Sequence, residues 1–143
     1  MWSFKKDFPA WTDEKLQQVY MDILQKAGYE PRVDSDGDVV FKKENMTFVI
    51  QPSGKDPIFF RLFLPNIYPV ESEEERGRIR VAMDMANALC KAAKVFTVNN
   101  NVWVSIEFFV NHPQDVETFL ERALGAIDNA AKIFVVRLNT LDA

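Results

Sequence analysis

The segment Ser72–Lys94, SEEERGRIRVAMDMANALCKAAK, decides the fold because it separates two β-rich blocks of the chain. Ser72 and Glu75 are spaced as a capping box, which predicts that a helix begins here. Apolar side chains then recur at helical spacing, at Ile79, Met83, Ala86, Cys90 and Ala93, with a flanking row of Ala82, Met85 and Leu89. We therefore expect one amphipathic helix over 72–94 that packs against both blocks.

The composition predicts a single α+β domain over residues 1–143. Hydrophobic residues make up 48% of the chain and include 12 Phe, which is enough apolar material for a full core. We expect that core to span 12–138. Ahead of it lies an aromatic arm, 1–11, that either packs onto the domain or docks onto a partner or membrane. The aromatic residues of the arm are Trp2, Phe4, Phe8 and Trp11.

Charge and hydropathy limit the classes of partner. The net charge is −4, with basic and acidic residues interspersed, so the basic stripe of a nucleic-acid binder is missing from the sequence. No apolar run approaches the ~20 residues that span a bilayer, and the N-terminus lacks the apolar region of a signal peptide. The single cysteine excludes an internal disulfide and favours a reducing compartment. These features predict a cytoplasmic protein that binds neither nucleic acid nor membrane.

The block before the central helix predicts one helix and four strands. Thr12 suits an N-cap and Gly28 a left-handed C-terminal cap, so the helix spans 12–27. Asp36-Gly37 is a hairpin turn signal, and Pro65 closes the last strand of the block. We expect the strands at 30–33, 39–43, 46–51 and 58–64.

The block after the central helix predicts a hairpin and a final helix. Strands are expected at 95–98 and 102–110, around a turn at 99–101. Pro113 begins a helix that extends to about Leu138. The apolar face expected for this helix comprises Val116, Phe119, Leu120, Ala123, Ile127, Ala131 and Phe134. The order αββββαββα, with hairpins instead of parallel crossovers, predicts an antiparallel sheet packed with three helices.

The strands carry more aromatic side chains than one buried face requires. A sheet with one solvated face should alternate apolar and polar residues, yet both faces of 58–64 and 102–110 are apolar. The surplus consists of Phe59, Phe63, Trp103 and Phe109. Either helices cover both faces, or this second face meets another subunit, as in a homodimer.

The acidic run Asp34–Asp38 invites an EF-hand interpretation and fails it. In that motif a glycine occupies position 6 and a glutamate position 12; counted from Asp34, these positions hold Val39 and Asn45. We therefore interpret the run as a hairpin turn with no metal.

The remaining reactive residues favour structural roles. His112 precedes Pro113 at a helix start, and Cys90 lies on the apolar stripe of the central helix. Glu107 is the best lone acid, and we expect it either to lie at an exposed edge or to pair with Arg61 or another base. Asn87 borders the stripe, where its amide should hydrogen-bond a neighbouring strand or loop. No catalytic residue, metal or cofactor is therefore predicted.

Three short motifs resemble the YbjN-like domain, a family described as bacterial and sensory-transduction-regulator-like. They are Gly28-Tyr29, Asp36-Gly37-Asp38 with Phe41, and Ala86-Asn87-Ala88-Leu89. The resemblance implies a fold like that of type III secretion chaperones, often dimeric and without enzyme activity. Chaperones of that fold hold extended client segments against apolar surface. Gly28, Asp36, Gly37 and Asn87 would then be structural residues of the motif.

These observations predict a non-enzymatic protein-binding or regulatory domain, dimeric, with a protein client or regulatory partner. One alternative is a small-molecule-binding domain or enzyme that uses Glu107 or the Asp34–Asp38 turn. A deep pocket around those acids would favour it. A second alternative is a structural homodimer without a client.

Overall fold

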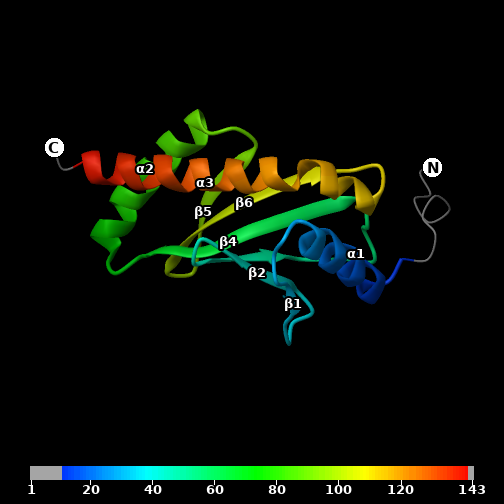
Figure 1. Ribbon diagram of the computed structural model, residues 1–143. Helices are drawn as coiled ribbons and strands as arrows, with labels where there is room; N and C mark the ends of the chain where they lie inside the picture. Colours follow the sequence, from blue (N-terminus) through cyan, green and yellow to red (C-terminus); the bar gives the residue numbers. More distant parts are fainter. Residues whose placement is uncertain (1–10, 142–143) are drawn as a thin grey trace, which may run out of the picture. The chain divides into compact units, whose positions relative to one another are not determined.

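The computed structural model describes residues 11–141 of this α+β protein. Three helices and six strands follow the order predicted from the sequence, with a short 3₁₀-helix before the last helix (Figure 1). The elements are α1 (Asp13–Lys26), β1 (Arg32–Val33), β2 (Val39–Lys43), β3 (Met46–Ile50), β4 (Phe59–Pro69), α2 (Glu73–Leu89), β5 (Ala93–Val98), β6 (Asn101–Phe109), η2 (Pro113–Asp115) and α3 (Val116–Thr140).

The strands form a six-stranded antiparallel sheet in the order β1-β2-β3-β4-β6-β5. Two-residue turns close two of its hairpins. Glu44 and Asn45 both have positive φ, 52° and 66°, and therefore form the mirror-image turn that matches strand twist. Asn99, with φ of 53°, serves the turn between β5 and β6.

The chain folds into two compact units. Among the described residues, the first comprises those up to Arg61 together with Phe108–Thr118, and the second comprises Leu62–Glu107 together with those from Phe119 onward. The prediction that residues 1–143 form a single domain stays a prediction.

In the first unit, α1 packs on β2 and η2 (Figure 1). The Thr12 hydroxyl accepts the Lys15 N–H at 3.1 Å and begins the helix. Gly28, with φ of 95°, ends it: its N–H donates to Gln25 O, and the next N–H donates to Leu24 O. These two bonds form a Schellman motif, as the Gly28 signal predicted. The ring centroids of Tyr20 and Phe60 lie 5.7 Å apart in an edge-on contact. Burial raises the pKa of the Tyr20 hydroxyl to about 12.

In the second unit, the buried face of α2 is narrower than predicted. Ile79, Ala82 and Ala86 are fully buried, whereas Leu89, assigned to the flanking row, is 54% exposed. The prediction that Ser72 is the N-cap is confirmed, because its hydroxyl accepts the Glu75 N–H at 3.1 Å. Tyr68 meets Phe134 of α3 at 6.0 Å.

The predicted end of the central helix is wrong. The helix ends at Leu89, Cys90 adopts extended backbone (φ −79°, ψ 161°), and Ala93 and Lys94 belong to β5. Ala92 makes the reversal with φ of 63°. Cys90 is therefore a C-cap residue, and pairing of β5 with β6 outweighs the helix propensity of the alanines here.

The prediction that β4 ends at Leu64 is also wrong, because the strand continues through Pro65 to Pro69. Asn66, with φ of 57°, interrupts its regular dihedrals immediately after Pro65. Such local irregularity is where a strand tolerates proline.

Two smaller corrections concern β1 and α3. β1 covers only Arg32–Val33, and Pro113 lies in the separate 3₁₀ turn before α3. Phe119 was assigned to the buried face of α3 and is 47% exposed, whereas Leu124 is buried.

Candidate functional site

Burial alternates along β4, as the sequence predicted. Phe60, Leu62 and Leu64 are buried, whereas Phe59, Arg61 and Phe63 are half-exposed. The four residues of the predicted partner surface lie two in each unit: Phe59 and Phe109 in the first, Phe63 and Trp103 in the second.

Phe59 and Phe109 form what we call the aromatic pair of the first unit. Their ring centroids are 5.5 Å apart, and Phe109 is 74% exposed. The Arg61 guanidinium lies 5.7 Å from the Phe59 ring centroid and donates to Gln51 Oε1 at 3.1 Å. A hollow of about 400 Å³ adjoins Phe59 and Arg61, and Pro52, Ser53 and Asp56 also line it. The pair thus combines apolar surface with a fixed cation.

Phe63, Trp103 and Phe96 form the aromatic cluster of the second unit. Trp103 meets Phe63 at 5.6 Å and Phe96 at 6.5 Å. Its indole N–H donates to Asn66 Oδ1 at 3.1 Å, which holds the ring at the irregular point of β4. All three rings are half-exposed.

Glu107 pairs with a base, which was one of the two roles expected for it, and Lys94 is such a base. Lys94 Nζ lies 3.0 Å from Glu107 Oε1, and the buried Ser105 hydroxyl donates to the same oxygen at 3.4 Å. Lys94 also lies 5.3 Å from the Phe96 ring centroid. The carboxylate therefore fixes the lysine beside the aromatic cluster.

The acidic run forms the hairpin turn expected from the sequence. Asp34 Oδ1 accepts the backbone N–H groups of Asp36 at 2.9 Å and Asp38 at 3.0 Å, and Gly37 has φ of 83°. The three carboxylates have oxygens within 4.8 Å of one another. Partial burial, then the charges of Asp34 and Asp36, raise the pKa of the Asp38 carboxyl. The local hydrogen bonds account for Asp34 and Gly37 without a metal.

His112 and Cys90 have local structural partners. His112 Nδ1 accepts the Gln114 N–H at 3.1 Å, while the Asp115 carboxylate accepts the His112 N–H at 3.0 Å, which completes a capping box. Trp11, the one described residue of the predicted arm, packs edge-on against His112 at 5.5 Å; 1–10 lie outside the described residues. The Cys90 thiol donates to Ala93 O at 3.3 Å, and partial burial raises its pKa.

Asn87 hydrogen-bonds a neighbouring strand, as predicted. Its Nδ2 donates to Val95 O at 3.0 Å, and its Oδ1 accepts the Val95 N–H at 2.8 Å. Val95 pairs with Val104 on its other side. The Asn87 amide therefore hydrogen-bonds both outward backbone groups of Val95 in β5, the strand at one edge of the sheet.

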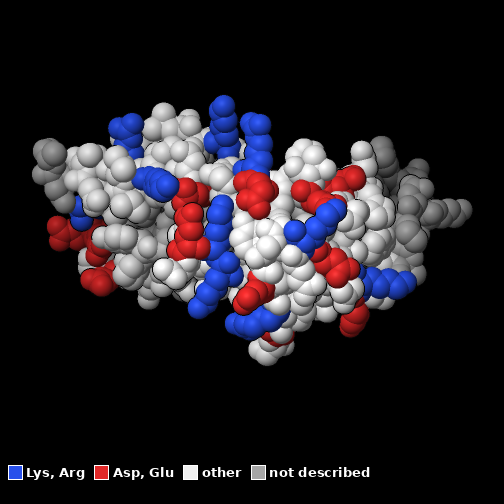
Figure 2. All heavy atoms as spheres, in the orientation of Figure 1, with Lys and Arg blue, Asp and Glu red and all other residues white. Residues whose placement is uncertain are grey.

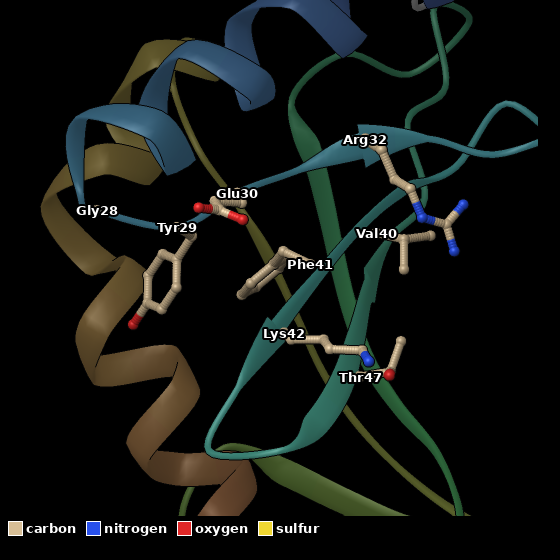
Figure 3. Close-up of a pocket in the computed structure, with 8 residues that line it drawn as sticks. All are labelled: Gly28, Tyr29, Glu30, Arg32, Val40, Phe41, Lys42 and Thr47. Atoms are coloured by element: carbon tan, nitrogen blue, oxygen red, sulfur yellow. The ribbon is translucent and has the colours of Figure 1, made fainter.

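Sequence reasoning missed a cavity of about 430 Å³ in the first unit (Figure 3). It lies where the chain from Gly28 to Arg32 diverges from β2, and it is lined by Gly28, Tyr29, Glu30, Arg32, Val40, Phe41, Lys42 and Thr47. The predicted strand over 30–33 would have closed this gap by pairing Glu30 with Lys42. The late start of β1 at Arg32 leaves the gap open. Pro31 was the available signal, because proline is confined to edge strands, strand starts and bulges.

Charge is mixed on one face of the molecule (Figure 2). Figure 2 shows basic and acidic side chains side by side over the visible face. Among the described residues, no helix is both long enough and apolar enough to cross a bilayer.

Compared with known proteins, the chain matches no family model and no curated sequence.

Proposed function

We propose that this chain is a non-enzymatic, cytoplasmic protein-binding or regulatory domain that acts as a homodimer. The proposal includes the YbjN-like resemblance and a secretion-chaperone-like use of apolar sheet surface to hold a client. Its leading support is Phe109, which is 74% exposed although it packs against a second phenylalanine. Aromatic rings left exposed in groups are typical of protein interfaces, where they supply large contact area.

Both aromatic groups have contacts that restrict one of their rings. The Phe59 ring lies against the Arg61 guanidinium, and the Trp103 indole donates a hydrogen bond to Asn66. Side chains that are ordered before binding lose less conformational entropy when a partner covers them. This favours a binding surface over incidental exposure.

The residues that could carry acid–base or nucleophilic chemistry have structural roles. Glu107 holds Lys94, His112 caps η2, and the raised pKa of Cys90 disfavours the thiolate that nucleophilic attack requires. The cavities of about 430 and 400 Å³ in the first unit are lined by neither Glu107 nor the turn acids Asp34–Asp38. The contacts therefore favour the binding function over the enzyme alternative.

The dimer is tested by light scattering after size exclusion, at micromolar protein concentration. We expect the mass of a dimer for the natural chain and for Val136→Asp, which places the same charge on a valine of α3 that is 57% exposed. Phe109→Asp should shift the mass toward the monomer, because a carboxylate in an apolar interface is costly. A monomer at every concentration would remove the dimer from the proposal.

Client binding is tested by cross-linking in lysate followed by mass spectrometry. We expect a client that the natural chain and Val136→Asp capture in equal amounts and that Phe63→Asp loses. Circular dichroism must show that the variants are folded. Equal capture by all three proteins would contradict a role for the aromatic cluster.

A further inference from the structure

The pairing of β2 leaves one of its residues without a strand partner on the outer side. Lys43 and Met46 flank the two-residue turn and form a hydrogen-bonded pair, so the N–H and C=O groups of Lys42 point away from β3. Val40, two residues earlier, faces the same way and pairs with Arg32 of β1. By the same register the position opposite Lys42 is Glu30, and β1 begins only at Arg32, two residues later.

The cavity of about 430 Å³ occupies this missing position (Figure 3). Tyr29 and Glu30 lie on one side of it, and Phe41 and Lys42 lie on the other. The Tyr29 and Phe41 rings meet at 5.2 Å, so the inner wall is aromatic and fixed. Its volume falls within the range of about 300–1,000 Å³ that ligand sites occupy.

Two cations lie on the same face of the sheet beside the gap. Arg32 is opposite Val40, and side chains two apart in a strand share a face, so Arg32 and Lys42 project together. Both are exposed. Thr47, opposite Lys42, adds a hydroxyl on this face. Glu30 is the one acid among the lining residues.

We propose that this gap binds an extended acidic peptide segment of a partner protein, which completes the missing strand pairing at Lys42. The peptide residue opposite Lys42 would exchange two backbone hydrogen bonds with it. Its side chain would project on the face of Lys42 and Arg32, so a carboxylate there meets both cations. Strand addition of this kind obtains affinity from the backbone and specificity from alternate side chains.

The residues around this gap belong to neither the aromatic pair nor the aromatic cluster. Binding of an acidic peptide is therefore separate from the homodimer and client proposed above, and Phe109→Asp should leave peptide binding unchanged.

The test is fluorescence anisotropy with a labelled hexapeptide of alternating valine and glutamate. Blocked termini leave the side chains as its only carboxylates. We expect binding at low salt that weakens as salt rises. A peptide with glutamine in place of glutamate should bind about tenfold more weakly, and so should one with N-methylated glutamates. On binding, the Lys42 amide should shift in nitrogen–proton correlation spectra and exchange more slowly.

Protein variants locate the site. Arg32→Glu combined with Lys42→Glu should weaken binding about tenfold, whereas Lys91→Glu, the same reversal at an exposed lysine outside this unit, should change it less than about twofold. Glu30→Gln removes the competing acid and should strengthen binding about two- to threefold.

Several results would overturn the inference. An N-methylated peptide that binds as well as its parent would exclude strand pairing. An equal effect of Lys91→Glu would show non-specific attraction by charge. Displacement of the peptide by free acetate at equal concentration would indicate a site for small anions. The peptide comparisons need no substitution in the protein, so they decide the matter even if a variant fails to fold.

Discussion

The two outer strands of the sheet treat their exposed edges differently. At the β5 edge, the Asn87 side chain hydrogen-bonds both Val95 N–H and Val95 O. At the β1 edge, the strand is only two residues long and begins beside an open gap. Unpaired edges invite pairing with other chains. The molecule satisfies one residue of the β5 edge with a side-chain amide and leaves the other edge short, charged and available.

The difference shows that one amide side chain is enough to satisfy the outward backbone groups of a residue in an edge strand. A primary amide offers a donor and an acceptor with the spacing of a peptide group, so Asn87 replaces one residue of a missing strand. It can do so because α2 lies beside β5. At the other edge, Gly28 directs the chain from α1 past β2, and Arg32 and Lys42 surround the gap.

The largest expected effect comes from removing the amide. Asn87→Ala should lower the free energy of unfolding by about 1.5 kcal/mol, because the loss of two hydrogen bonds exceeds the helix propensity gained. Urea denaturation measures the change, and hydrogen exchange at Val95 should become faster. Asn129→Ala, the same change at an exposed position of α3, should be neutral or slightly stabilising. Equal results at both positions would show that the amide does not hold the edge.

The same glycine-to-alanine substitution should change the free energy of unfolding in opposite directions in the regions of the two edges. Gly37 has φ of 83° in the turn that joins β1 to β2, so Gly37→Ala should destabilise by about 1 kcal/mol. Gly77 lies in the interior of α2, where an added Cβ meets nothing within 4 Å. Gly77→Ala should therefore stabilise by about 0.5–1 kcal/mol. Thermal and urea melts compare them, and the same sign in both variants would contradict these assignments.

A smaller effect is expected in the turn beside the open edge. The pKa of Asp38 is raised in the folded state, so the folded chain holds this proton more tightly than the unfolded chain does. The Asp38 carboxyl leaves the free energy of unfolding unchanged at pH values below its ordinary pKa. It lowers that free energy as the pH rises through the raised pKa of the folded state. Asp38→Asn should thus be more stable than the natural chain at pH 7, by under about 0.5 kcal/mol because Asp38 is only partly buried.

Melts at pH 3 and pH 7 check the sign for Asp38. The advantage of Asp38→Asn should vanish at the lower pH, where the aspartate is protonated in both states. An advantage that persists at pH 3 would point to a cause other than charge.

Calcium should produce the smallest effect of all. Asp34 Oδ1 already accepts two backbone hydrogen bonds, and the spacing of the turn lacks the EF-hand glutamate. Millimolar calcium should therefore leave the melting temperature unchanged. An increase of several degrees would mean that the three acids bind the ion.

Local signals in the sequence were sufficient where a single residue sets the backbone. Thr12, Gly28 and Gly37 each have a chemical reason for one conformation, and the structure places each as expected. The element order followed from these signals and from the alternation of apolar residues.

The predictions that failed depend on distant partners. No glycine or proline follows Leu89 to mark the helix end, which instead depends on the pairing of β5 with β6. Apart from Pro31, the strand pattern near Arg32 gave no sign that pairing with β2 would begin only there. The cavity was missed for that reason, since it exists only because two segments diverge.

The single cysteine gives the closed edge a built-in reporter. Cys90 joins α2 to β5, its thiol is half-buried, and its pKa is raised. Alkylation requires an exposed thiolate, so in the folded chain the reaction should be limited by how often this junction opens. The rate of maleimide labelling, compared between the natural chain and Asn87→Ala, therefore measures how often the β5 edge is released. The measurement needs no introduced cysteine.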